Sequence, residues 1–140
     1  MSLNQLVLSG ANPDMIVVIG YCFGGSGALE VERGHFPVKG IVSFHRGLAK
    51  DKDRIVTPIT AKVLLYHGAD DFFVPEEEVL AVQSEMRETK ADWQSISYAN
   101  SFYSFTDPEA GNDNLKGAGY NEKANNRSWQ HLLIFLKEIL

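Results

Sequence analysis

The chain has 140 residues, of which 44% are hydrophobic and 22% charged, and its 18 acidic side chains outnumber 13 basic ones to give a formal net charge of −5. This composition is typical of one globular domain, and the negative charge argues against nucleic acid or an anionic membrane as a partner, because both attract clustered basic side chains. No apolar run approaches the ~20 residues that span a bilayer, and no basic side chain precedes Arg33, so neither a membrane span nor a secretory signal is predicted.

Cysteine and histidine content limits the chemistry that the chain can carry. Cys22 is the only cysteine, which excludes a disulfide within the chain, and the histidines form no metal-binding motif. We therefore expect neither a metal nor a cofactor. An unpaired cysteine also fits a reducing compartment, so the expected location is the cytoplasm.

The first predicted strand covers residues 15–19, a continuously apolar run of the kind found in buried parallel strands. It leads into Gly20-Tyr21-Cys22-Phe23-Gly24-Gly25 and then into a short helix predicted at residues 24–32. A strand, a sharp glycine-flanked turn and a helix form the setting of a nucleophile elbow. The segment predicts Cys22 as a nucleophile, whose thiolate the helix N-terminus stabilises, and the backbone N–H of Phe23 as an oxyanion donor.

Other interpretations of this segment are a buried inert thiol and a phosphate-binding loop. Free cysteines often pack in protein cores as small apolar groups, but the flanking glycines favour the elbow. The segment has no lysine of the Walker A type and lacks the third glycine of a dinucleotide-binding motif, which excludes both phosphate loops.

Residues 38–44 and 62–67 predict two more buried parallel strands. Asp70 and Asp71 follow the second of them, and a helix is predicted at residues 75–90, beginning with a proline and three glutamates. Because carboxyl ends of parallel strands meet at one edge of a sheet, Asp71 is a candidate acid beside the elbow. One of the two aspartates is expected to cap the helix and the other to act as the acid, and the alternative assignment stays open.

The last predicted elements are a strand near the sheet edge at residues 93–98 and an amphipathic helix at residues 127–140. Between them, residues 100–123 are rich in turn formers, and a loop of this length is usually functional. The order of elements predicts an α/β fold, a mostly parallel sheet of about four strands flanked by helices in three layers.

Several segments in this order resemble the dienelactone hydrolase family, whose members are α/β-hydrolases with a cysteine nucleophile. The resemblance covers residues 12–140 and is carried by Gly20-Tyr21-Cys22-Phe23-Gly24-Gly25, Val42-Ser43-Phe44-His45, His67-Gly68-Ala69-Asp70-Asp71-Phe72-Phe73-Val74-Pro75, Phe105-Thr106-Asp107-Pro108, Tyr120-Asn121-Glu122-Lys123-Ala124 and Arg127-Ser128-Trp129. It implies hydrolysis of a small-molecule ester or lactone, with Cys22 as the nucleophile and Asp71 as the acid of the triad. It also implies one truncated domain over residues 1–140, equivalent to the C-terminal half of the family's fold.

The resemblance further implies a catalytic histidine directly before Ser-Phe-Thr-Asp-Pro, where this chain has Tyr103. A phenol is a poor proton acceptor at neutral pH, and loss of a general base costs about 10²–10⁴ in rate. Neither His45 nor His67 is expected to replace it. The prediction is therefore an impaired ester hydrolase, and the alternative is a catalytically silent binding or assembly module on the same scaffold.

The first strand also predicts self-association. In the family's fold it lies inside the sheet, so its outer edge is expected to be bare in this chain. Residues 15–19 contain no lysine, proline or inward charge that would prevent pairing along that edge. We expect a homo-oligomer, most simply a two-fold dimer.

Overall fold

Four short strands form one parallel sheet in the order β1-β2-β3-β4, so neighbours along the chain are neighbours in the sheet. They are β1 (Val17–Tyr21), β2 (Gly40–Phe44), β3 (Lys62–Gly68) and β4 (Asp92–Tyr98). The structure is a computed structural model, and it describes residues 3–45, 53–55, 57–111 and 117–140. The predicted α/β fold with its parallel sheet is confirmed.

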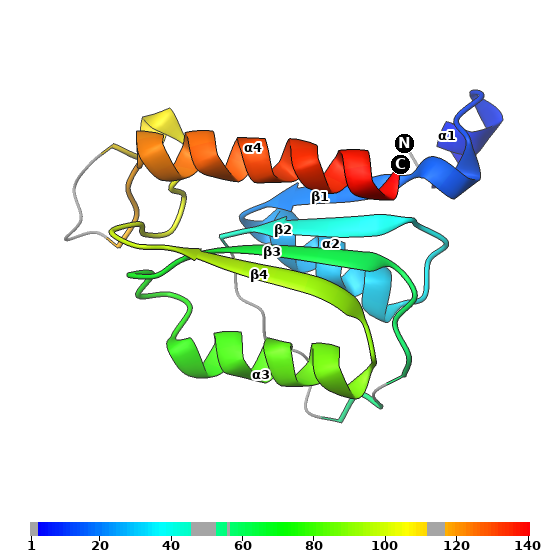
Figure 1. Cartoon of the computed structure of the whole chain (residues 1–140), viewed down its shortest axis with the longest axis horizontal. Helices are drawn as coiled ribbons and strands as arrows, with labels where there is room; N and C mark the ends of the chain where they lie inside the picture. Colours follow the sequence, from blue (N-terminus) through cyan, green and yellow to red (C-terminus); the bar gives the residue numbers. More distant parts are fainter. Residues whose placement is uncertain (1–2, 46–52, 56, 112–116) are drawn as a thin grey trace.

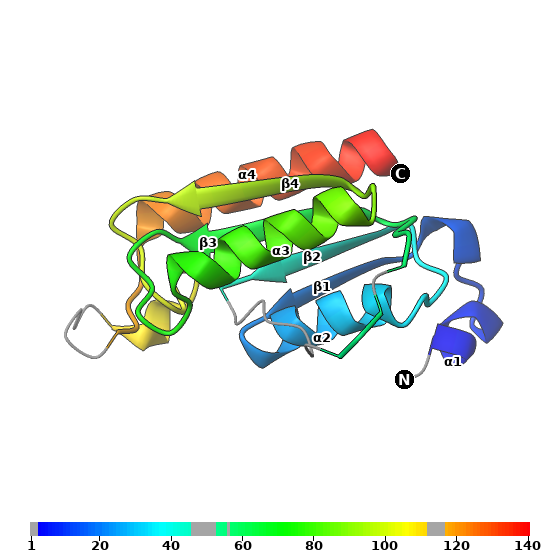
Figure 2. The ribbon, with the colours of Figure 1, turned by 90° about the horizontal axis from the view of Figure 1, so that it is seen from below.

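Helices cover both faces of the sheet and make three layers (Figure 1). Two helices, α2 (Phe23–Arg33) and α3 (Glu76–Glu88), pack on one face, and α4 (Glu122–Ile139) packs on the other (Figure 2). The first two connect β1 to β2 and β3 to β4. Each of these connections leads to the next strand on the same side of the sheet. Since crossover connections between parallel strands are right-handed, both helices lie on the same face.

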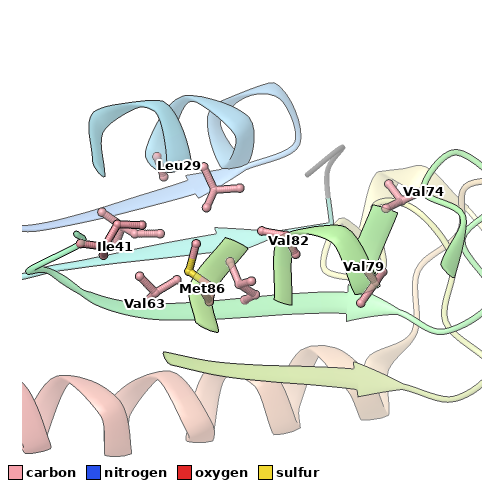
Figure 3. Close-up of a cluster of buried hydrophobic side chains, with 10 residues drawn as sticks. Leu29, Ile41, Val63, Val74, Val79, Val82 and Met86 are labelled. Atoms are coloured by element: carbon pink, nitrogen blue, oxygen red, sulfur yellow. The ribbon is translucent and has the colours of Figure 1, made fainter. Parts of the chain in front are cut away.

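Each face of the sheet has its own apolar core, because successive side chains of a strand point to opposite faces. Figure 3 shows the first core, in which Ile41 and Val63 of the sheet meet Leu29 of α2 and Met86 of α3. The second core lies under α4. It contains Val42, Phe44, Leu64, Tyr66, Tyr98, Phe105, Ala124, Leu132, Phe135 and Ile139. Every residue of β2 is buried, since this strand is paired on both sides and covered on both faces.

Most element boundaries differ by one or two residues from the sequence prediction, and local capping explains the later start of β1 and the earlier start of α4. β1 begins at Val17 because Pro13–Met15 forms a short 3₁₀ helix, η1, whose cap Asn12 accepts a hydrogen bond from the N–H of Asp14. α4 begins at Glu122 because the side chain of Asn121 accepts a hydrogen bond from the N–H of Ala124 and caps the helix there. The chain also has a short helix α1 (Leu3–Leu8) and a second 3₁₀ helix η2 (Pro108–Ala110).

The outer edge of β1 is open in the part of the chain that is described. β1 pairs only with β2 there. α1 has no buried residue and lies beyond the end of the sheet at which the strands begin, so it does not cover this edge (Figure 2). Among the described helices, none combines the length and the apolar character that a membrane crossing requires.

Candidate active site

Cys22 lies in the tight turn between β1 and α2, with backbone angles φ 53° and ψ −127°. Its N–H donates to the carbonyl of Phe44 at 3.2 Å, and its own carbonyl accepts from the N–H of Gly25 at 2.8 Å. The turn requires glycine at position 20, because a Cβ on Gly20 would lie 1.9 Å from the carbonyl oxygen of Gly24. The strand, the turn and the helix that the sequence predicts are therefore present, with Cys22 at the centre of the turn.

The Cys22 sulfur lies between two residues that, like Cys22 itself, have positive φ. His45 Nδ1 and Ser104 Oγ each lie 3.6 Å from Cys22 Sγ. Six non-glycine residues have positive φ in the described part of the chain, and these three are among them, at 53°, 37° and 60° for Cys22, His45 and Ser104. Such backbone strain costs about 1–3 kcal/mol per residue and concentrates at functional sites. The strain marks this cluster as the candidate active site.

His45 is buried, at 1% exposure, within a shell of aromatic rings. Its ring centroid lies 5.1 Å from that of Phe105 and 5.8 Å from that of Tyr103. Burial lowers the pKa of His45 to about 4, although the charge of Asp107 opposes the shift. The imidazole is therefore neutral near pH 7, with one N–H and one free lone pair. Its Nε2 lies 2.7 Å from Thr106 Oγ1, so Thr106 holds the side of the ring that faces away from Cys22.

The loop after β4 carries both Ser104 and Thr106, and it is anchored to the fold on either side of them. Phe105 is fully buried between the two, and its carbonyl accepts from the N–H of Asn121 at 3.0 Å. The N–H of Asp107 donates to the carbonyl of Ser104 at 2.9 Å. This loop is the one that the sequence predicts to be functional; its residues 112–116 lie outside the described residues.

Asp71 follows β3 at the same edge of the sheet and is buried. Its Oδ1 accepts from the N–H of Phe73 at 2.9 Å, while its Oδ2 is buried without a hydrogen-bond partner among the described residues. Burial raises the pKa of Asp71. Neither aspartate caps α3, whose N-cap is Pro75 with no side-chain hydrogen bond, and Asp70 is exposed. Asp71 is thus the buried carboxylate of the pair.

Tyr103 lies between the His45 side of the site and the loop that carries Asp71. Its ring packs edge-on against His45, with centroids 5.8 Å apart, and against Phe73, with centroids 5.7 Å apart. Its carbonyl accepts from the N–H of Gly119 at 3.0 Å. Phe23 is the first residue of α2, so its N–H lies at the positive end of the helix dipole beside Cys22. The described residues contain no group of three or more His, Cys, Asp or Glu side chains placed to hold a metal ion.

Comparison with known proteins identifies the family. The model of the dienelactone hydrolase family matches residues 1–140. The chain belongs to the dienelactone hydrolase family. A Caenorhabditis elegans protein is 34% identical over an alignment 129 residues long, which covers 85% of this chain and 77% of that protein.

Two solved structures extend the comparison to the fold of the dienelactone hydrolase family. A dienelactone hydrolase-like promiscuous phosphotriesterase from metagenomic libraries is 38% identical to this chain and superimposes with a TM-score of 0.83. The match covers 92% of this chain and 54% of that one. The structure named m3DLH is 36% identical to this chain, with a TM-score of 0.90. The match covers 99% of this chain and 58% of that one. The chain therefore spans little more than half the length of these relatives.

Sequence reasoning missed the place of His45 beside the sulfur, although a signal for it exists. β1 and β2 are parallel and adjacent, with Tyr21 opposite Phe44. Cys22 and His45 are the next residue on each strand, so this register makes them neighbours at the edge of the sheet. Ser104 and Thr106 carried no such signal, because their positions depend on the path of the loop after β4.

Proposed function

We propose that the chain hydrolyses carboxylic esters or lactones through Cys22, at a rate limited by the presence of Tyr103 where the family has its histidine. The observation that carries the proposal is the strained turn that places the Cys22 sulfur at the N-terminus of α2, between His45 and Ser104. The sulfur attacks the ester carbonyl, and the N–H of Phe23 donates to the oxyanion. The alcohol then leaves, and water hydrolyses the thioester.

The surroundings of Asp71 support the proposal that the hydrolytic activity is impaired. In the family's triad this carboxylate would orient a histidine, and in this chain Tyr103 lies at that histidine's position, between the loop of Asp71 and His45. The buried oxygen Asp71 Oδ2 has no hydrogen-bond partner among the described residues. A buried acceptor without a donor costs about 1–3 kcal/mol, which supports the interpretation that a partner for this group has been lost.

The substrate class is proposed from the family, since the chain spans little more than half of its solved relatives. A phosphotriester is a second candidate substrate, because one relative at 38% identity is described as a phosphotriesterase. The alternative function is a catalytically silent binding or assembly module. We also propose a reducing cytoplasm as the location, since a thiol nucleophile must stay reduced, and self-association along β1.

The test is hydrolysis of p-nitrophenyl acetate and of a p-nitrophenyl phosphotriester by the parent chain, Cys22→Ala and Cys22→Ser. A matched control is Gln130→Ala on the exposed face of α4. We expect the parent and the control to hydrolyse the acetate and Cys22→Ala to lose that activity while its circular dichroism spectrum is unchanged. Equal rates in the parent and in Cys22→Ala would favour the silent module.

A further inference from the structure

We propose that His45 acts as the base for Cys22 in place of the family's missing histidine, and that Thr106 and Ser104 orient this pair. The inference rests on the proposed function and names a further catalytic residue for it. It differs for His45 from the expectation from sequence, in which neither His45 nor His67 replaces the missing base.

The geometry is a continuous row of four polar side chains at the carboxyl edge of the sheet. Thr106 Oγ1 lies 2.7 Å from His45 Nε2, His45 Nδ1 lies 3.6 Å from Cys22 Sγ, and Ser104 Oγ lies 3.6 Å from the same sulfur. Cys22 follows β1, His45 follows β2, and the other two residues belong to the loop after β4. The rings of Phe44 and Phe105 pack against the imidazole and fix its position.

The hydrogen bonds of this row can run in either of two directions. In the first, Ser104 donates to the sulfur, the thiol donates to His45 Nδ1, and Nε2–H donates to Thr106. In the second, every donor and acceptor is reversed. Only the first direction presents a lone pair of the imidazole to the thiol proton, and we assign it to the reactive state.

The first direction also keeps every group hydrogen-bonded after the proton has moved. Once Nδ1 has accepted the thiol proton, the thiolate accepts hydrogen bonds from Nδ1–H and from the Ser104 hydroxyl. Charge-assisted bonds of this kind are stronger than neutral ones. The imidazolium keeps its second N–H on Thr106, so no polar group of the row loses its partner.

The proposed reaction balances without any other reactant than ester and water. The sulfur bonds to the carbonyl carbon as its proton passes to Nδ1, and the carbonyl electron pair moves to oxygen. Collapse of this intermediate breaks the ester C–O bond, and Nδ1 returns its proton to the leaving alkoxide. Water then attacks the thioester while giving a proton to Nδ1, the C–S bond breaks, and the sulfur recovers that proton as the acid leaves.

The burial of His45 determines when the proton moves. The pKa of His45 is lowered to about 4 by its burial, far below the value near 8.5 of an ordinary thiol. The imidazole is therefore neutral at rest near pH 7 and can accept the thiol proton as the sulfur attacks the substrate. Among the described residues, the titratable groups that face the imidazole are Cys22, Tyr21 and Tyr103, and the charge that acts on it is that of Asp107.

The test is the pH dependence of kcat/KM for p-nitrophenyl acetate in the parent, His45→Gln, Thr106→Val and Ser104→Ala. His35→Gln is the matched control, because His35 is an exposed histidine whose Nε2 also lies beside a threonine hydroxyl, at 2.6 Å from Thr57 Oγ1. We expect kcat/KM to fall by about 10²-fold or more in His45→Gln, and to be unchanged in His35→Gln. Parent activity should persist down to about pH 5 and fall as His45 becomes protonated near pH 4.

If His45→Gln does not fold, Thr106→Val tests whether His45 acts as the base, because this variant leaves the His45 imidazole in place. Without Thr106 the imidazolium loses a hydrogen-bond acceptor, so we expect the acidic limb of the pH profile to move to lower pH. A purely structural role for His45 would leave the limb where it is. Retention of activity within two-fold in His45→Gln, with activity abolished in Cys22→Ala, would overturn this inference and leave the proposed function intact. Equal activity in the parent and in Cys22→Ala would overturn both.

Discussion

At the scale of single residues, the chemistry depends on how accessible the Cys22 thiol is in the folded chain. The residue is partly exposed at the centre of the turn into α2, where helix N–H groups and Ser104 can stabilise the negative charge that develops on the sulfur as it reacts. We expect iodoacetamide to alkylate it without denaturant and faster than it alkylates the unfolded chain at pH 7. Mass spectrometry of timed samples measures both rates. Protection until urea is added would indicate a buried structural thiol instead.

Tyr103 gives the second prediction at this scale. We expect Tyr103→His to raise kcat/KM for p-nitrophenyl acetate at least ten-fold, a small part of the usual contribution of a general base. The new imidazole would lie between His45, which contacts the nucleophile, and the loop of Asp71, whose Oδ2 lacks a partner among the described residues. Steady-state kinetics of the folded variant measures the gain.

A double-mutant cycle with Asp71→Asn shows whether the gain comes from a restored triad. In the chain that keeps Tyr103, Asp71→Asn should have little effect on kcat/KM, since the described hydrogen bond of Asp71 stays within its own loop. In the Tyr103→His variant, Asp71→Asn should remove most of the gain in kcat/KM. Independent effects of the two substitutions would show that the new histidine does not act through Asp71.

At the scale of elements, the junction of β1 and α2 is a close contact of two backbones, and this explains the glycine at position 20. A Cβ on Gly20 would clash with the backbone of Gly24, whereas a Cβ on Gly27 in the exposed middle of α2 meets nothing within 4 Å. We expect Gly20→Ala to lower the free energy of unfolding by about 1–3 kcal/mol or more. Gly27→Ala should raise it by about 0.5–1 kcal/mol. Urea denaturation of both variants measures the difference, and similar values would contradict the clash.

Glu32 makes the stability of α2 depend on pH. Burial, together with the charge of Glu85, raises the pKa of Glu32 to about 7 from an ordinary value of 4.5. The folded state therefore binds a proton that the unfolded chain releases, so this contribution is present below about pH 4.5 and lost as pH rises through 7.

We expect Glu32→Gln to be more stable than the parent at pH 8, by about 1–3 kcal/mol. The amide carries no charge to bury at that pH, and the advantage should shrink toward pH 4.5, where the parent carboxyl is protonated in the folded state. Urea midpoints at both pH values measure the difference. Equal differences at the two pH values would show that ionisation of Glu32 is not the cause.

At the scale of the whole molecule, the unpaired outer edge of β1 is the surface that we expect to bind a second copy of the chain. An unpaired strand edge without charge or proline pairs readily with another copy, and β1 has no such protection on the described chain. We expect light scattering at micromolar concentration to give about twice the monomer mass of 15.6 kDa.

Ile19→Lys should restore the monomer, because Ile19 is 40% exposed on β1 and its lysine would be buried in the paired edge. Leu80→Lys on the exposed face of α3 is the matched control and should leave the mass unchanged. A parent mass near 15.6 kDa would contradict pairing along β1.

The sequence alone predicted the α/β fold, four strands, the main helices, the turn at Cys22 and the family, because these follow from local patterns. Continuous apolar runs indicate buried parallel strands, and glycines around a cysteine indicate a tight turn. The start of β1 at Val17 was missed because the capped 3₁₀ helix Pro13–Met15 and its C-cap Ile16 take up the first two residues of the apolar run.

Only the tertiary structure places His45 and Ser104 against the Cys22 sulfur. These residues are far apart in the chain, and their contact depends on the register of β1 against β2 and on the path of the loop after β4. Burial, which lowers the pKa of His45 to about 4, is likewise a property of the assembled core. Residue identity and spacing define the nucleophile locally, but its partners come from two other segments of the chain, and the three segments meet only when the sheet has formed.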